Sequence, residues 1–147
     1  MAGVRRVSRS ILRYAYPLYV VAIVLQVYFA GEGIFGAGDS SIEDAGALDL
    51  HRGFGWFITQ PFGLLLLIVT LLAWLPNKRI RMLSIAAPIL LFIQSILPSA
   101  GRWVAALHPV NAFVLLGLMG YLTWIFRSGQ ALAEDAATED LPAAEPA

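Results

Sequence analysis

Four long runs of apolar residues constrain this chain more than any other feature of its sequence. They cover about residues 14–30, 54–75, 80–97 and 109–126. Each run can cross a hydrocarbon core about 30 Å thick as a helix that rises about 1.5 Å per residue. Helix is the expected form because lipid offers the backbone no other hydrogen-bond partner. The sequence therefore predicts an all-α fold, a four-helix transmembrane bundle spanning residues 14–127.

Composition supports a membrane protein. Hydrophobic residues make up 59% of the chain and charged residues only 14%, whereas roughly a quarter of the residues are charged in soluble domains. The chain has no cysteine, which excludes disulfides, iron–sulfur clusters, thiolate-ligated haem and covalently attached c-type haem. Its formal net charge of zero argues against nucleic acid as a partner.

Proline residues mark several ends of these spans. Pro76 and Pro98 follow the second and third apolar runs, and Pro109 opens the fourth. Two further prolines, Pro61 and Pro88, lie inside spans, where a proline bends a helix and frees a carbonyl group one turn earlier. We therefore expect kinks at these two positions, with free carbonyl groups at Phe57 and Ser84.

Basic residues gather at one end of the predicted bundle. Eight of them fall before the first span, between the second and third, or after the fourth: Arg5, Arg6, Arg9, Arg13, Lys78, Arg79, Arg81 and Arg127. Only Arg52 and Arg102 lie at the other end. Because cytoplasmic segments carry the excess of lysine and arginine, we expect both termini in the cytoplasm.

Two terminal segments are expected outside the bilayer. Residues 1–13 form a basic cytoplasmic N-terminus, and residues 128–147 form an acidic tail, rich in alanine, that we expect to be disordered. The first apolar run is longer than the core of a typical signal peptide and lacks a nearby cleavage pattern. It is therefore expected to remain as a transmembrane helix.

A layer of polar residues lies at the outer end of all four predicted spans. The two histidines of the chain, His51 and His108, precede the second and fourth apolar runs. Gln26 and Gln94 lie about one turn before the ends of the first and third runs, and Asn111 follows His108 by almost one helical turn. Polar residues in a membrane usually face the bundle interior or a cavity, so this convergence predicts a site.

Haem b is the simplest occupant for such a site. Neutral imidazole is a standard axial ligand, and a bis-histidine site takes one imidazole from each of two facing helices. His51 and His108 are therefore the predicted iron ligands. Gly55 would let the flat macrocycle approach the backbone, and Arg52 and Arg102 could pair with the haem propionates.

Each of these residues also has a simpler interpretation. The histidines could be interfacial residues bonded to loops or headgroups, and Gln26 and Gln94 could be interhelical hydrogen-bond partners. The glycines suit close helix contacts, and the two arginines suit interface anchors. A metal ion held by the histidine pair lacks an evident third ligand apart from loop carboxylates.

Two short motifs carry a resemblance to a known family. The chain has His51-Arg52-x-x-Gly55 at the start of the second span and Leu107-His108-Pro109-Val110-Asn111-Ala112 at the start of the fourth. In these motifs it resembles a bacterial family of four-helix membrane proteins, catalogued as domain of unknown function 6220, over about residues 14–126. The resemblance implies a multi-pass protein of the bacterial plasma (inner) membrane. More distantly, the motifs are similar to helices of haem A synthases and of four-helix modules of membrane b-type cytochromes.

Two functional hypotheses follow. The first is a small haem b protein for electron transfer or haem handling near the outer membrane face, with a quinone or another membrane redox protein as its partner. The second is a cofactor-free membrane subunit, or a protein that binds a lipid or small ligand in the same layer. A carrier or channel is disfavoured because no internal repeat or charge within the membrane is obvious. The deciding feature is whether His51 and His108 face each other.

Overall fold

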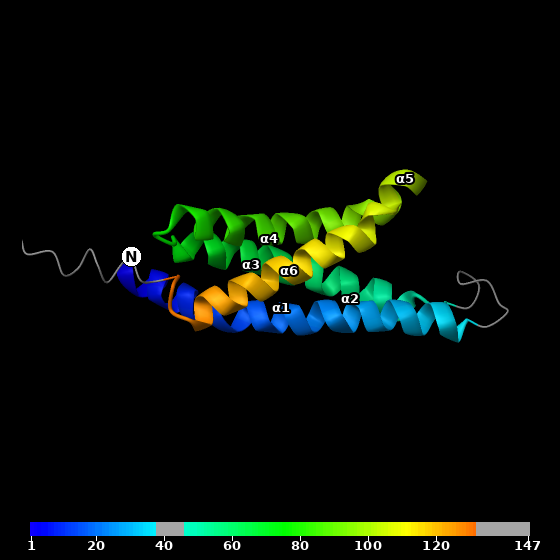
Figure 1. The fold of residues 1–147 in the computed structure, drawn as a ribbon, viewed down its shortest axis with the longest axis horizontal. Helices are drawn as coiled ribbons and strands as arrows, with labels where there is room; N and C mark the ends of the chain where they lie inside the picture. Colours follow the sequence, from blue (N-terminus) through cyan, green and yellow to red (C-terminus); the bar gives the residue numbers. More distant parts are fainter. Residues whose placement is uncertain (38–45, 132–147) are drawn as a thin grey trace, which may run out of the picture.

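The computed structural model describes residues 1–37 and 46–131, and every regular element in that part of the chain is helical (Figure 1). The elements are α1 (Ala2–Gly36), α2 (Asp49–Thr59), α3 (Pro61–Ala73), α4 (Lys78–Ile96), the short 3-10 helix η1 (Leu97–Ser99), α5 (Arg102–Ala105) and α6 (Leu107–Arg127). Within the described residues, four helical stretches are long and apolar enough to cross a membrane: α1, α2 with α3, α4 with η1, and α5 with α6. The predicted all-α bundle of four transmembrane helices is confirmed.

The four spans form a ring. α1 packs against α3 and α6, and α4 packs against the same two helices. In the described part of the chain, α1 and α4 lie diagonally opposite each other without close backbone contact, as do α3 and α6. The chain thus forms two helical hairpins, the first from α1, α2 and α3 and the second from α4 to α6.

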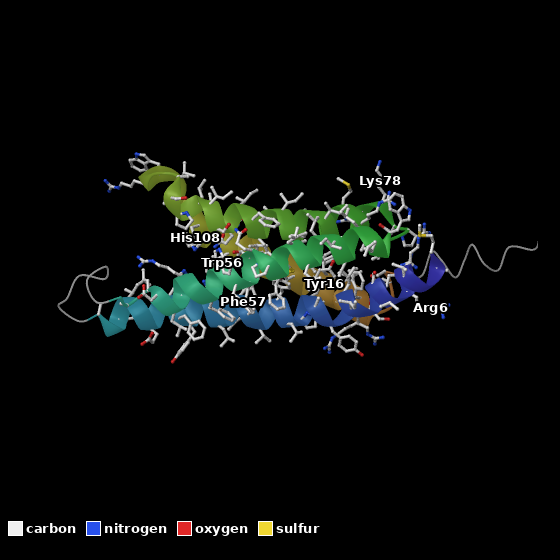
Figure 2. The ribbon with its side chains drawn as sticks, turned by 180° about the vertical axis from the view of Figure 1, so that it is seen from behind. Arg6, Tyr16, Trp56, Phe57, Lys78 and His108 are labelled. Atoms are coloured by element: carbon white, nitrogen blue, oxygen red, sulfur yellow. The ribbon has the colours of Figure 1, made fainter. Side chains whose placement is uncertain are left out.

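The two ends of the bundle differ in chemistry. The N-terminus, the turn between α3 and α4, and the end of α6 lie at one end, which we call the basic end (Figure 1). Arg6 and Lys78 lie there, whereas His108 and Trp56 lie toward the opposite end, the histidine end (Figure 2). The start and finish of the helical bundle therefore share one end, as the placement of basic residues predicts.

α1 is longer than the apolar run that predicts it. The helix starts at Ala2 and includes the basic segment, and Pro17 lies within it. Because arginine is a good helix former, the helix continues beyond the apolar run without a break. Residues 132–147 of the predicted disordered tail lie outside the described residues.

The second span breaks once, beside a proline. α2 ends at Thr59, Gln60 lies between the helices, and α3 begins at Pro61. The Tyr19 hydroxyl of α1 donates to the carbonyl oxygen of Ile58 at 3.1 Å, and this bond is buried. The predicted kink at Pro61 is therefore present, whereas α4 continues through Pro88 as one helix.

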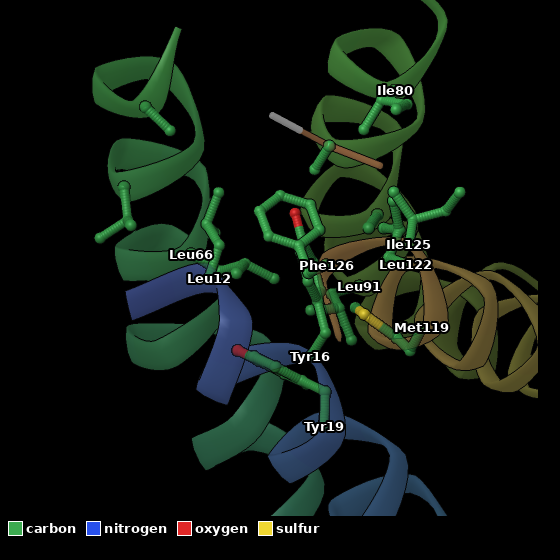
Figure 3. Close-up of a cluster of buried hydrophobic side chains, with 14 of the residues drawn as sticks. Leu12, Tyr16, Tyr19, Leu66, Ile80, Leu91, Met119, Leu122, Ile125 and Phe126 are labelled. Atoms are coloured by element: carbon green, nitrogen blue, oxygen red, sulfur yellow. The ribbon is translucent and has the colours of Figure 1, made fainter. Parts of the chain in front are cut away.

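A cluster of buried apolar side chains lies in the half of the bundle toward the basic end. Figure 3 shows Tyr16 and Tyr19 of α1 among leucine, isoleucine and methionine side chains from the other helices. Tyr16 stacks at an angle on Phe126, with ring centres 5.1 Å apart. This core fixes the helices that carry the polar layer at the histidine end.

Candidate functional site

The two histidines lie side by side at the histidine end. Their ring centres are 6.1 Å apart, and the ring planes meet at 77°. His51 lies in the first turn of α2 and His108 in the first turn of α6, so each hairpin supplies one imidazole. The structure thus brings together the two residues on which the sequence analysis depends.

His51 is held by Gln26 through two hydrogen bonds. Its ring nitrogen Nδ1 lies 3.0 Å from the carbonyl oxygen of Gln26. In return, the Gln26 side-chain amide donates to the carbonyl oxygen of His51 at 2.7 Å. Both bonds join α1 to α2 within the first hairpin, so that hairpin fixes the direction of the His51 ring.

His108 is held in the same way by Gln94. The His108 Nδ1 lies 3.0 Å from the carbonyl oxygen of Gln94, and the Gln94 amide donates to the carbonyl oxygen of His108 at 3.1 Å. Asn111 adds a further partner, because its amide donates to Gln94 Oε1 at 2.7 Å and to the carbonyl oxygen of Leu90 at 3.1 Å. The second hairpin therefore fixes its own histidine.

These hydrogen bonds determine which nitrogen of each neutral imidazole carries the proton. A carbonyl oxygen can only accept a hydrogen bond, so each Nδ1 carries the proton and each Nε2 keeps a lone pair. This is the tautomer of many metal-bound histidines, in which a backbone carbonyl orients the ring. The Nε2 of His108 also lies 3.2 Å from the Gln94 amide nitrogen, which can donate to it.

The matching pairs belong to an internal repeat of the two hairpins. The buried residues of α1 and α4 keep the same spacing to their glutamines: Leu12, Tyr16, Tyr19 and Ile23 before Gln26, and Ile80, Ser84, Ala87 and Leu91 before Gln94. In the returning helices, Gly55 and Ile58 follow His51 as Ala112 and Leu115 follow His108. The hairpins thus share a pattern of burial despite few shared residue types.

The repeat shifts by one residue at the helix break. Beyond Gln60, the buried positions Leu66, Val69 and Thr70 of α3 match Leu122, Ile125 and Phe126 of α6 only if one extra residue is counted in the first hairpin. The Gln60 amide donates to the Ser95 hydroxyl of α4 at 2.7 Å. The break therefore accommodates an inserted residue and adds a polar contact between the hairpins.

Gly55 makes room for Gln26. A Cβ atom at Gly55 would collide with the Gln26 amide, whereas a Cβ at Gly53 would meet no atom within 4 Å. The absence of a side chain at position 55 thus permits the bond between Gln26 and His51. Gly55 also lines the cavity described next.

A cavity of about 690 Å³ lies beside the histidine pair, within the range of about 300–1,000 Å³ of small-molecule and cofactor sites. Its wall is mainly apolar. The predicted site residues that line it are Gln26, His51, Arg52, Gly55, Gln94 and His108. Four further wall residues, Ile23, Leu91, Phe113 and Leu115, illustrate its apolar character.

Two of the predicted site residues lie away from this wall. Asn111 is half-buried and bonded to Gln94, and Arg102 lies on α5 with its guanidinium 5.5 Å from the centre of the Trp103 ring. Neither is among the described residues that line the cavity. Arg52 does line it, and its guanidinium lies 3.5 Å from the Asp49 carboxylate. Of the two arginines, only Arg52 is placed to meet a ligand in this cavity.

His51 and His108 are the residues that could hold a metal or cofactor at this end. Their ring centres are 6.1 Å apart in an edge-on arrangement, and an imidazole nitrogen lies about 2.0–2.1 Å from a bound metal ion. No group of three or more histidine, aspartate or glutamate side chains gathers within residues 1–37 and 46–131.

Sequence reasoning did not identify the contacts of Gln60 and Tyr19. Both act at the helix break, through Ser95 and the carbonyl group of Ile58. A polar residue directly before a proline within an apolar span is the signal that points to Gln60.

Comparison with known families matches residues 26–102 to a family of unknown function, DUF6220. The matched segment includes Gln26, His51 and Gln94 but ends before His108. No curated protein and no solved structure matches the chain. The distant similarity to haem-binding modules therefore remains a prediction from the sequence motifs.

Proposed function

The chain belongs to the DUF6220 family of unknown function, whose match covers more than half of it. From the geometry of its histidine pair, we propose that it is a membrane protein that binds haem b between His51 and His108. We assign it to electron transfer or haem handling near the outer face of a bacterial plasma membrane. A quinone or another membrane redox protein would exchange electrons with it.

One observation carries this proposal: two imidazoles, each with its Nδ1 proton held by a carbonyl oxygen, lie with ring centres 6.1 Å apart. This arrangement leaves a lone pair on the Nε2 of each ring, and the Nε2 of His108 lies beside the Gln94 amide. The adjoining cavity is apolar and of cofactor size.

Different residues of the site would have different roles in haem binding. His51 and His108 would ligate the iron, and Gln26 and Gln94 would orient their rings. Arg52, on the cavity wall, would pair with a propionate. Haem bound in this way supplies one-electron redox chemistry, whose potential is tuned by the axial ligands and their hydrogen bonds.

Binding at His108 requires one local change. The Gln94 amide now lies 3.2 Å from the His108 Nε2 and would have to release that nitrogen. The same amide nitrogen donates to the His108 carbonyl oxygen, and the Gln94 Oε1 accepts from Asn111. A rotation of the Gln94 side chain would therefore have to keep or replace these bonds.

The test is an absorption spectrum of the protein, expressed with ample haem, purified in detergent and reduced with dithionite. We expect a sharp α-band typical of haem b in the wild type, and its loss or strong reduction in His51→Ala and His108→Ala. Leu50→Ala and Leu107→Ala are matched controls, because each exposed leucine precedes a histidine without lining the cavity. Circular dichroism and gel filtration should show that all five proteins remain folded. A wild-type protein without a visible band would contradict the proposal.

A specific observation favours a second candidate, a cofactor-free protein that binds a lipid, a quinone or another small apolar ligand. The Gln94 amide already satisfies the His108 Nε2 without a metal, and the cavity wall is mainly apolar. Mass spectrometry of the same preparation would find such a ligand bound to protein that shows no haem band.

A further inference from the structure

Three hydroxyl groups are buried together in the half of the bundle away from the histidines. Tyr16 of α1, Thr70 of α3 and Ser84 of α4 are 0%, 1% and 0% exposed. Tyr16 is in the apolar core, against the ring of Phe126 (Figure 3). The three groups thus come from three helices and from both hairpins.

None of the three hydroxyl oxygens has a hydrogen-bond partner within the described part of the chain. This is unusual for serine and threonine in a helix, where the hydroxyl commonly donates to a carbonyl one turn earlier. Thr59 and Thr123 do so here, to the carbonyl oxygens of Gly55 at 2.8 Å and Met119 at 2.7 Å. Thr70 and Ser84 leave this local option unused.

The three hydroxyls come from helices that pack in sequence, α1 against α3 and α3 against α4, and no pair of them has the geometry of a direct hydrogen bond. Buried polar groups in native proteins are nearly always hydrogen-bonded to protein or to ordered water. Three unpaired hydroxyls at one place therefore indicate a missing partner common to all three.

We propose that these three hydroxyls bind one water molecule. A buried water typically makes about three hydrogen bonds to polar groups that lack other partners, and each hydroxyl here can both donate and accept. A cation is disfavoured, because the buried polar or charged residues of the described chain are Ser8, Thr59, Thr70 and Ser84, none of which carries a charge. The ligand class is thus a single neutral molecule that donates and accepts hydrogen bonds.

The position of this site gives it a structural role. Tyr16 and Ser84 occupy equivalent positions in the two hairpins, as His51 and His108 do. The water therefore lies where the hairpins meet and joins α1 and α3 of the first to α4 of the second. This role is independent of any cofactor at the histidine end.

The direct test is a structure of the full chain in lipid nanodiscs or crystals, at a resolution that shows ordered water. We expect a density peak within hydrogen-bond distance of the Tyr16, Thr70 and Ser84 oxygens. An empty site in the wild type, with the hydroxyls bonded directly to one another, would overturn the proposal.

Variants provide a second measurement. The double variant Thr70→Val/Ser84→Ala should lose the water, because only Tyr16 would remain to hold it, whereas the matched control Thr123→Val should keep it. In thermal unfolding, each single variant should lower the Tm, and the double variant should lower it by less than the sum of the two, because both lose the same molecule. A density peak that persists unchanged in the double variant, or strictly additive shifts in Tm, would contradict a shared water.

Discussion

Gly55 lies next to the side-chain amide of Gln26. A Cβ atom at position 55 would occupy the space of that amide. We expect Gly55→Ala to displace this amide from the His51 carbonyl oxygen and to lower the free energy of unfolding by about 0.5–1.5 kcal/mol, the net contribution of one part-buried hydrogen bond. Thermal unfolding in detergent measures the effect.

Gly53→Ala is the matched control for this change. Gly53 lies in the same helix, and a Cβ there meets no atom within 4 Å, so this variant should be neutral or slightly stabilising, since alanine favours helix over glycine. Equal losses in the two variants would show that glycine flexibility matters at both positions and that contact with Gln26 does not.

At single positions, the sequence identified the right residues but not their partners. Depth in the membrane was enough to select His51, His108, Gln26 and Gln94 as one layer. Their principal partners are backbone carbonyl groups, which no residue type reveals. Gly55 was expected either to clear space for a cofactor or to allow a close helix contact, and the atom nearest to it in space is in the Gln26 amide.

The break between α2 and α3 is stabilised from another helix. Tyr19→Phe removes the hydroxyl that donates to the Ile58 carbonyl oxygen, so we expect a loss of about 1–3 kcal/mol in the free energy of unfolding. Tyr28→Phe, at a tyrosine of the same helix that is 64% exposed, should have little effect. Chemical or thermal unfolding of the two variants makes the comparison, and a similar stability for both would contradict a specific role of Tyr19.

The helices themselves were predictable, and their ends were not. Hydropathy detects runs of apolar residues and not the polar turns that continue a helix, so it located the four spans but missed the start of α1 at Ala2. Arg9 was interpreted only as an orientation charge. Its guanidinium also donates to the carbonyl oxygens of Ala73 and Trp74 at the end of α3, a contact between residues far apart in sequence.

The whole molecule has one predicted direction in the membrane. We expect single cysteines placed at Lys78 or Arg127 of the basic end to react with a membrane-impermeant maleimide only after cells are lysed. Cysteines at Leu50 or Trp103 of the histidine end should react in spheroplasts. The natural chain contains no cysteine, so the wild type is an unlabelled background. Labelling in the opposite pattern would place the histidine end in the cytoplasm.

The internal repeat of the molecule could not be read from the sequence. The two hairpins share their glutamine and a leucine–histidine pair, but most equivalent positions, such as Tyr16 and Ser84, agree only in being buried. The extra residue at the helix break beside Gln60 then shifts the buried positions of α3 by one residue relative to those of α6. Equivalent positions that are buried alike but carry different residue types can be recognised only in the three-dimensional structure.

The hydrogen bonds that orient each histidine lie within its own hairpin. The two rings can therefore be oriented at different times during synthesis. Gln26 and His51 leave the ribosome before any residue of the second hairpin, so the first imidazole can be set in direction while its counterpart does not yet exist. The 6.1 Å spacing between the rings and the wall of the cavity depend on both halves. We therefore expect the site to be completed when the second hairpin docks against the first.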